Sequence, residues 1–195
     1  DVIVAISSSD TTEGTVSPSS LTITPANWNQ PQPVTVTGVD DTIADGNINY
    51  SIVTAAASSA DPNFNGVNPS DVSVINNDND SPGITVTPTS GLVTNEGGGI
   101  ATFQIVLNTT PTSDVTIPLS STDTTEGTVS SPNVTFTPAD ALIPKVVTVT
   151  GVNDTAADGD IDYEIVTGIA VSADSNYAGT DATDVDVVNQ DNDTP

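Results

Sequence analysis

Apolar and polar residues alternate with a period of two along most of the chain. Ala101, Phe103 and Ile105 are separated by Thr102 and Gln104, for example. This alternation is typical of a β-strand with one buried face, and the many Val and Thr residues favour the same structure. No stretch has the spacing of an amphipathic helix. The pattern therefore predicts an all-β protein.

Gly, Pro, Asn and Asp interrupt the alternating runs and divide the second half of the chain into seven short strands. We expect strands near 84–88, 100–107, 114–119, 133–137, 145–151, 161–166 and 184–189. Seven short antiparallel strands at this spacing predict an Ig-like β-sandwich.

The chain repeats itself. Asp1 aligns with Asp114 without a gap over 80 residues, and more than half of the aligned positions are identical; DTTEGTVS, for example, occurs in both copies. A repeat of this length is a whole domain. We expect an incomplete domain over 1–80, a linker over 81–83 and a complete domain over 84–193. The first domain has no counterpart of 84–113, so it should lack its two N-terminal strands and expose apolar faces and strand edges.

Charge restricts the possible partners. The chain has 26 acidic residues and one basic residue, Lys145, and its formal net charge is −25. Such a polyanion is not expected to bind nucleic acid or to insert into a membrane. With neither His nor Cys, it lacks the usual nucleophile and base pairs of enzymes, so we expect no enzymatic activity. Divalent cations are the natural partners.

The acidic residues gather in loops that should lie together. In an antiparallel sandwich, alternate strands run toward the same pole, so the loops after strands 84–88, 114–119, 145–151 and 184–189 meet there. These loops contain Glu96; Asp123 and Glu126; Asp154, Asp158 and Asp160; and Asp191 and Asp193. Carboxylates this close repel one another unless a cation compensates them. Calcium accepts six to eight oxygen ligands in flexible geometry, and without His or Cys, zinc and copper are poor candidates.

The loop motifs VTGVDDTIADGNINY and VTGVNDTAADGDIDY, each followed by a strand that ends in DND, resemble the Calx-beta domain. That family is known from sodium/calcium exchangers and from long bacterial surface proteins. The resemblance implies a Ca2+ site in each repeat. By position, the implied ligands are Asp40, Asp41, Asp45, Asp78 and Asp80 in the first repeat and Glu96, Asp154, Asp158, Asp191 and Asp193 in the second.

The chain also departs from the family pattern. Ile48 and Ile161 occupy the position of the second Glu of the central motif, Asn153 replaces the first Asp of a pair, and GTVS replaces the family's G-x-D-Y. Fewer ligands imply one or two ions per pole. Asp123 or Glu126, or Asp10 or Glu13 in the first repeat, could take the place of the missing Asp.

Two classes of function are consistent with these features. The first is a calcium-stiffened repeat of a long extracellular fibre or adhesin stalk, with an ion where successive repeats join. Its partners would be adjacent repeats of the same protein, and a preceding or neighbouring chain would supply strands to the first repeat. Strand supply by neighbouring chains would form a homopolymer. The alternative is a calcium-dependent binding or sensor module, either lectin-like or regulatory. Near-identical repeats and a short linker favour the stalk. We expect Trp28 and Tyr50 to be packing residues rather than a sugar platform.

Overall fold

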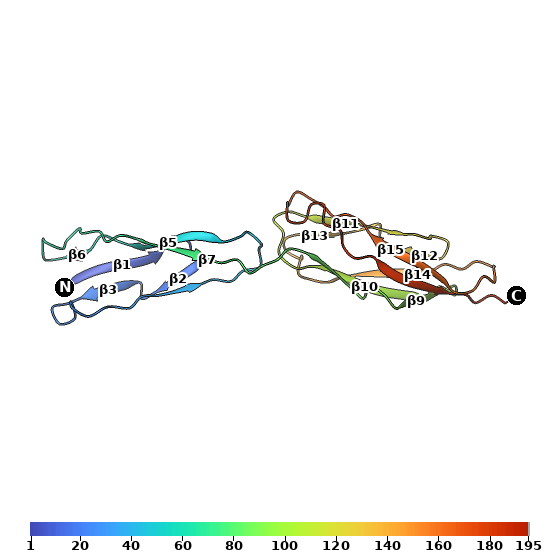
Figure 1. The fold of residues 1–195 in the computed structure, drawn as a ribbon, viewed down its shortest axis with the longest axis horizontal. Coiled ribbons are helices and arrows are strands. Elements are labelled where there is room, and N and C mark those ends of the chain that lie inside the picture. The colour runs from blue at the N-terminus through green and yellow to red at the C-terminus, as the bar shows by residue number, and fades with distance from the viewer. Residues whose placement is uncertain (195) are drawn as a thin grey trace. The chain divides into compact units, whose positions relative to one another are not determined.

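The computed structural model describes residues 1–194, and within that range it contains strands and no helix. The all-β prediction is therefore confirmed, and no helix of the described residues is long and apolar enough to span a membrane. The chain forms two compact units (Figure 1). The first comprises Asp1–Asp41 and Asp45–Asn79, and the second comprises Thr42–Ala44 and the chain from Asp80 onward.

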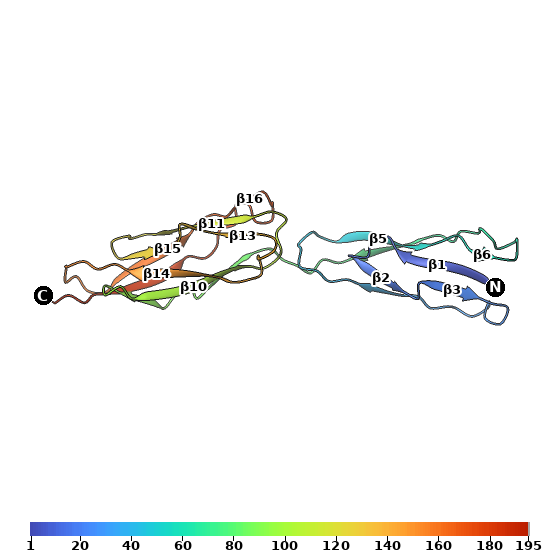
Figure 2. The ribbon, with the colours of Figure 1, turned by 180° about the vertical axis from the view of Figure 1, so that it is seen from behind.

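The second unit consists of two sheets that face each other. Its strands are β8 (Ile84–Thr87), β9 (Leu92–Asn95), β10 (Ile100–Leu107), β11 (Val115–Ser121), β12 (Gly127–Val129), β13 (Asn133–Phe136), β14 (Lys145–Gly151), β15 (Ile161–Thr167), β16 (Val171–Ser172) and β17 (Val185–Gln190). One sheet has the order β12-β14-β10-β8. The other has the order β13-β11-β15-β17-β9, with β16 beside β11 (Figure 2).

The core of the second unit lies between these sheets. Phe103 and Ile105 of β10 and Val149 of β14 point inward from one sheet, and Ile165 and Val187 point inward from the other; each of these side chains is at most 1% exposed. The alternation along the strands thus brings every second residue into one shared core. Burial of each such side chain contributes about 1.5–3 kcal/mol to folding.

The seven predicted strands are present, but the second unit contains three more. β12 and β16 are too short to give a periodic signal. β9 follows β8 after Pro88 and Gly91, where the chain leaves one sheet and enters the other. Gly91 has a φ of +76°, which an L side chain rarely adopts, so the alternation is interrupted there. β9 then pairs with β17 in parallel, which departs from the expected antiparallel order.

The first unit contains counterparts of seven of these ten strands. They are β1 (Val2–Ser8), β2 (Gly14–Ser17), β3 (Ser20–Ile23), β4 (Thr35–Gly38), β5 (Ile48–Thr54), β6 (Ser58–Ser59) and β7 (Val72–Asn76). One sheet has the order β3-β1-β5-β7, with β6 beside β1, and β2 pairs with β4. Strands β8, β9 and β10 have no counterpart among the described residues of the first unit.

The core of the first unit is correspondingly small. Ile6, Tyr50 and Ile52 form its buried cluster, and the hydrophobic residues around them are only partly buried. Tyr50 is a packing residue as expected, with 5% of its surface exposed. The same expectation for Trp28 was wrong, because its side chain is 70% exposed. In the second unit the equivalent residue, Ala141, is covered by the segment that ends at Leu107, whose amide donates to the Ala141 carbonyl.

Candidate metal sites

The same group of three carboxylates occurs once in each unit. In the first unit, carboxylate oxygens of Glu13, Asp41 and Asp45 lie within 4.8 Å of one another. In the second unit, Glu126, Asp154 and Asp158 occupy the equivalent positions with the same separation. We call these groups the first triad and the second triad. In each, the glutamate immediately precedes strand β2 or β12, and both aspartates lie in the loop between strands β4 and β5 or β14 and β15.

A further cluster is present in the second unit and shares one aspartate with the second triad. Oxygens of Glu96, Asp154 and Asp193 also lie within 4.8 Å of one another. Glu96 follows β9, Asp154 follows β14 and Asp193 follows β17, so three chain segments meet here. We call this group the Glu96 cluster. Because Asp154 belongs to both groups, its carboxylate could bridge two ions.

The separations are compatible with calcium. Oxygen ligands bind calcium at about 2.3–2.6 Å, so two ligands of the same ion are at most about 5 Å apart. All three groups meet this limit. Three carboxylates leave further positions on the ion for backbone carbonyls and water. The geometry can therefore hold a hard divalent cation without a large rearrangement of the loops.

The two triad glutamates are buried, and an asparagine that recurs in both units holds each in place. Glu13 is 8% exposed and accepts a hydrogen bond from the side-chain amide of Asn76 at 3.2 Å. Glu126 is 7% exposed and accepts one from the side-chain amide of Asn189 at 3.1 Å. In each case the hydrogen bond engages one carboxylate oxygen. A buried carboxylate that lacks a basic partner is unusual, because removal of charge from water is costly.

The Glu96 cluster shows the electrostatic conflict most clearly. Glu96 is 4% exposed and accepts a hydrogen bond from the backbone amide of Asn192 at 3.0 Å. That hydrogen bond lowers the pKa of Glu96, but burial and repulsion by Asp191, Asp154 and Asp193 together raise the pKa above its ordinary value. One oxygen of Asp193, Oδ2, is buried and has no hydrogen-bond partner. A cation at this position would supply the missing interaction and relieve the repulsion.

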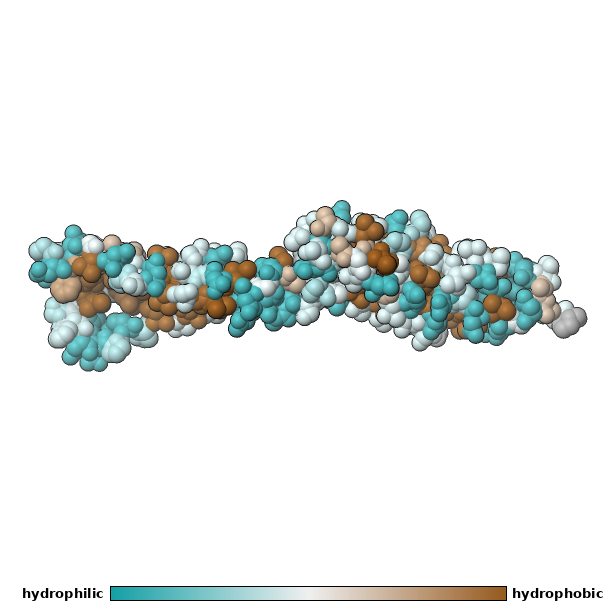
Figure 3. Space-filling view, turned by 45° about the horizontal axis from the view of Figure 1, so that its top comes forward, coloured by the Kyte–Doolittle hydropathy of each residue, from teal (hydrophilic) through white to brown (hydrophobic). Residues whose placement is uncertain are grey.

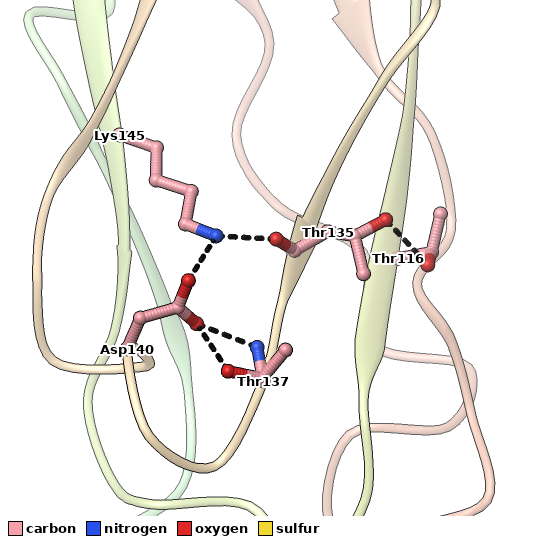
Figure 4. A network of polar contacts seen from close by, with 5 residues as sticks. All are labelled: Thr116, Thr135, Thr137, Asp140 and Lys145. Atoms are coloured by element: carbon pink, nitrogen blue, oxygen red, sulfur yellow. Dashed lines mark hydrogen bonds and ion pairs between the residues drawn. The ribbon is translucent and has the colours of Figure 1, made fainter.

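The protein cannot neutralise these groups with its own basic side chains. Lys145 is the only Lys or Arg in the sequence, and there is no His. Lys145 is bound elsewhere: its Nζ donates to Asp140 at 2.6 Å and to the Thr135 carbonyl (Figure 4). It also lies 4.7 Å from the centre of the Phe136 ring. Hydrogen bonds from Lys145 and Thr137 lower the pKa of Asp140 to about 2.

Several other acidic residues stabilise loops. Asp78 accepts a hydrogen bond from the Gly46 amide at 2.7 Å, and Asp191 accepts one from the Gly159 amide at 2.8 Å. Both bonds tie the end of the last strand to the loop that contains the triad aspartates. Among residues 1–194, Asp40, Asp78, Asp80 and Asp191 of the expected ligands belong to none of the three groups.

Asp10 and Asp123, two of the alternatives for the missing ligand, accept hydrogen bonds within their own turns and belong to none of the three groups. The hydroxyl and the amide of Thr125 donate to Asp123, and both bonds lower the pKa of that carboxyl; Thr12 does the same for Asp10. The glutamates three residues later point into the triads. The repeated DTTEGTVS motif is the sequence signal that points to Glu13 and Glu126, but it does not show which of its acids is buried.

Comparison with known proteins gives only weak similarity. No protein-family model matches the chain, and no curated protein matches it. It resembles the solved structure of surface layer protein SbsC domains 1–6, with a TM-score of 0.36 and 16% identity over 98% of this chain and 20% of that one. The S-layer protein SbsC domains 4 and 5 give a TM-score of 0.37 and 15% identity over 96% of this chain and 70% of that one. Similarity at this level does not support an argument about function.

Proposed function

We propose that the chain is a calcium-binding structural repeat of an extracellular fibre or adhesin stalk, with a Calx-beta-like arrangement of ligands. The observation that carries this proposal is the Glu96 cluster. It contains a carboxylate that is 4% exposed and another with a buried oxygen that lacks a hydrogen-bond partner. Carboxylates in such surroundings are unfavourable without a cation, and oxygen ligands of this kind suit calcium.

Recurrence of the triad supports a role that is repeated along the protein. Glu13, Asp41 and Asp45 match Glu126, Asp154 and Asp158 one for one. A site that occurs in each unit suits a chain built from successive similar segments, in which every unit needs the same stabilisation. An ion bound to each triad would join two loops that otherwise repel each other, and so would stiffen that end of the unit.

The expected affinity supports a location outside the cell. Each triad contains three acidic ligands on loops, and extracellular calcium modules with such sites bind in the range of about 10⁻⁴–10⁻³ M. Calcium at this concentration is available outside cells. At millimolar calcium, a site with this affinity is about half to nine-tenths occupied, so the ion would act as a structural component. We therefore place the protein at the cell surface or in an extracellular fibre.

Thermal unfolding with and without calcium tests the proposal. A ligand that binds only the folded state raises the unfolding free energy by about 2.7 kcal/mol at one hundred times its dissociation constant. The second unit should therefore unfold at a higher temperature in calcium at one hundred times the dissociation constant than in EDTA. In Asp154→Asn, which affects both groups of the second unit, most of this difference should disappear.

The matched control is Asp162→Asn. Asp162 is an exposed residue of β15 in the same unit and belongs to none of the three groups. This variant loses the same charge, so it should keep the calcium response of the unaltered protein. Equal responses in Asp154→Asn and Asp162→Asn would mean that calcium acts through general charge screening, and the proposal would be wrong.

A further inference from the structure

Hydrophobic residues lie open on the first unit at positions that are buried in the second. Phe64, Val72 and Val36 are 51%, 54% and 37% exposed, whereas their equivalents Tyr177, Val185 and Val149 are at most 1% exposed. Figure 3 shows brown, hydrophobic side chains on the surface of the first unit. The two valine pairs occupy the same places in equivalent strands, and Phe64 and Tyr177 occupy the same place in equivalent turns, so the difference arises from what covers them.

In the second unit the cover is the segment 84–113. Its strand β10 pairs with β14 from Ile100↔Thr150 to Ile105↔Lys145, and its strand β9 pairs with β17. Beyond β10, the Thr109 backbone is bound to the Tyr177 hydroxyl. In the described first unit, β4 pairs only with β2, and β7 pairs only with β5. In the second unit, β14 pairs with β10 and β17 pairs with β9. The corresponding edges of β4 and β7 in the first unit therefore have no neighbouring strand among the described residues.

Two hollows mark the same face. One, of about 180 Å³, is lined by residues that include Ile6, Val36 and Val72. Their equivalents in the second unit pack in one cluster with Phe103 and Ile105 of β10. The hollow therefore lies where inward-pointing side chains of such a strand would fit.

The other hollow, of about 420 Å³, is lined by residues that include Ile23, Trp28 and Phe64. The equivalents of these three residues, Phe136, Ala141 and Tyr177, are each at most 1% exposed. In the second unit they lie beneath the end of β10 and the residues that follow it, because Leu107 bonds to Ala141 and Thr109 bonds to Tyr177. Trp28 therefore lies at the place where the end of such a segment would dock.

We propose that this open face binds a polypeptide segment with the sequence pattern of residues 84–113, which we call the docking segment. It would extend one sheet beside β4 and the other beside β7, and it would bury its alternate apolar side chains in the two hollows. This is addition of β-strands to open sheet edges, in which backbone hydrogen bonds provide affinity and alternate side chains provide specificity. The inference does not depend on calcium binding.

Charge favours this occupant over a second copy of the whole chain. Residues 84–113 contain one acidic residue, Glu96, out of 26 in the protein, and no basic residue. The whole chain has a net charge of −25. Two copies would therefore repel each other strongly, whereas a nearly neutral segment adds little repulsion to an acidic unit.

A synthetic peptide of residues 82–113 tests the inference with the intact protein. Trp28 is the only tryptophan and belongs to the first unit, so its fluorescence reports on this face and not on the second unit. We expect the peptide to shift Trp28 emission to shorter wavelength in a saturable manner, with one peptide bound per chain. A peptide with Ile105→Asp should not bind, because Ile105 is fully buried in the second unit. A peptide with Gln104→Asp carries the same added charge at an exposed position and should still bind.

A variant of the protein provides the complementary control. Val72→Asp alters a side chain that is already 54% exposed, so the first unit should fold as before, which circular dichroism can verify. This variant should lose the response to the peptide. The inference is overturned if Trp28 emission does not respond, or if the Ile105→Asp peptide gives the same response. Dimerisation of the chain in ultracentrifugation without peptide binding would assign the face to a second copy and would also overturn it.

Discussion

Removal of the Tyr177 hydroxyl is expected to destabilise the second unit. This hydroxyl donates to the Thr109 carbonyl at 2.9 Å, accepts from the Thr109 amide at 3.1 Å and bonds to the Thr109 side chain at 2.7 Å. Tyr177 is 1% exposed and Thr109 is 2% exposed. Together these bonds fasten the end of the segment 84–113 onto the rest of the unit. In Tyr177→Phe the ring remains and all three bonds are lost.

The size of the effect follows from the groups left behind. A buried donor or acceptor without a partner costs about 1–3 kcal/mol, and Tyr177→Phe leaves both the amide and the carbonyl of Thr109 unpaired. We expect the unfolding free energy of the second unit to fall by about 2–4 kcal/mol. For a unit of this size, that corresponds to a decrease in Tm of about 10 °C.

Differential scanning calorimetry can measure this change, and Trp28 fluorescence can identify the transition of the first unit. The matched control is Phe64→Tyr, which introduces the equivalent hydroxyl in the first unit. Phe64 is 51% exposed, so the added hydroxyl stays in water and should leave Tm nearly unchanged. A decrease of less than about 2 °C in Tyr177→Phe would show that the buried hydrogen bonds are not what fastens the segment.

Two further predictions concern packing and pH. In Gly127→Ala the new Cβ would lie 2.1 Å from the Tyr163 hydroxyl and 2.3 Å from its ring, so we expect a loss of about 1–3 kcal/mol in urea unfolding. Gly168→Ala, whose Cβ would have no neighbour nearer than 3.4 Å, should change stability by less than about 0.5 kcal/mol, and equal losses would refute the clash. Because the pKa of Asp140 is lowered from 3.8 to about 2, its interaction with Lys145 stabilises the fold above pH 3.8 and is lost as the pH falls through about 2. The stability difference between the unaltered protein and Asp140→Asn should shrink over this range, and a constant difference would contradict the assignment.

The period-two pattern was sufficient to predict the long strands, because each has one face in the core. β14 and β15 show this directly, since every second residue from Val147 and from Tyr163 is buried. The pattern could not predict β9, because Pro88 and Gly91 interrupt the alternation where the chain changes sheets. Its parallel pairing with β17 joins residues almost a hundred positions apart, and no local signal specifies such a pairing.

For the candidate metal sites, too, the sequence predicted some residues, whereas others depend on tertiary structure. The resemblance of one loop to the Calx-beta motif implied Asp154 and Asp158 as ligands, and both lie in the second triad. Sequence alone could not distinguish Glu126 from Asp123, since both lie in one acidic turn. The distinction depends on tertiary structure: Asn189 of β17 holds Glu126 inside, whereas Thr125 binds Asp123 at the surface. Asp191 accepts a bond from the Gly159 amide and belongs to none of the three groups, so its role as a ligand stays a prediction.

Direct measurement of bound calcium is the simplest test of whether the acidic groups of both units hold an ion. Bound metal is first removed from the protein with EDTA. The protein is then dialysed against buffered calcium, and its calcium content is measured by elemental mass spectrometry. We predict saturable binding of at least one calcium ion in each unit, with one site lost in Asp41→Asn and binding to the second unit lost in Asp154→Asn. The Asp162→Asn control should retain the full amount. Calcium binding by these groups would be contradicted if the protein solution contained no more calcium than the dialysis buffer. It would also be contradicted if both site variants bound as much calcium as the unaltered protein.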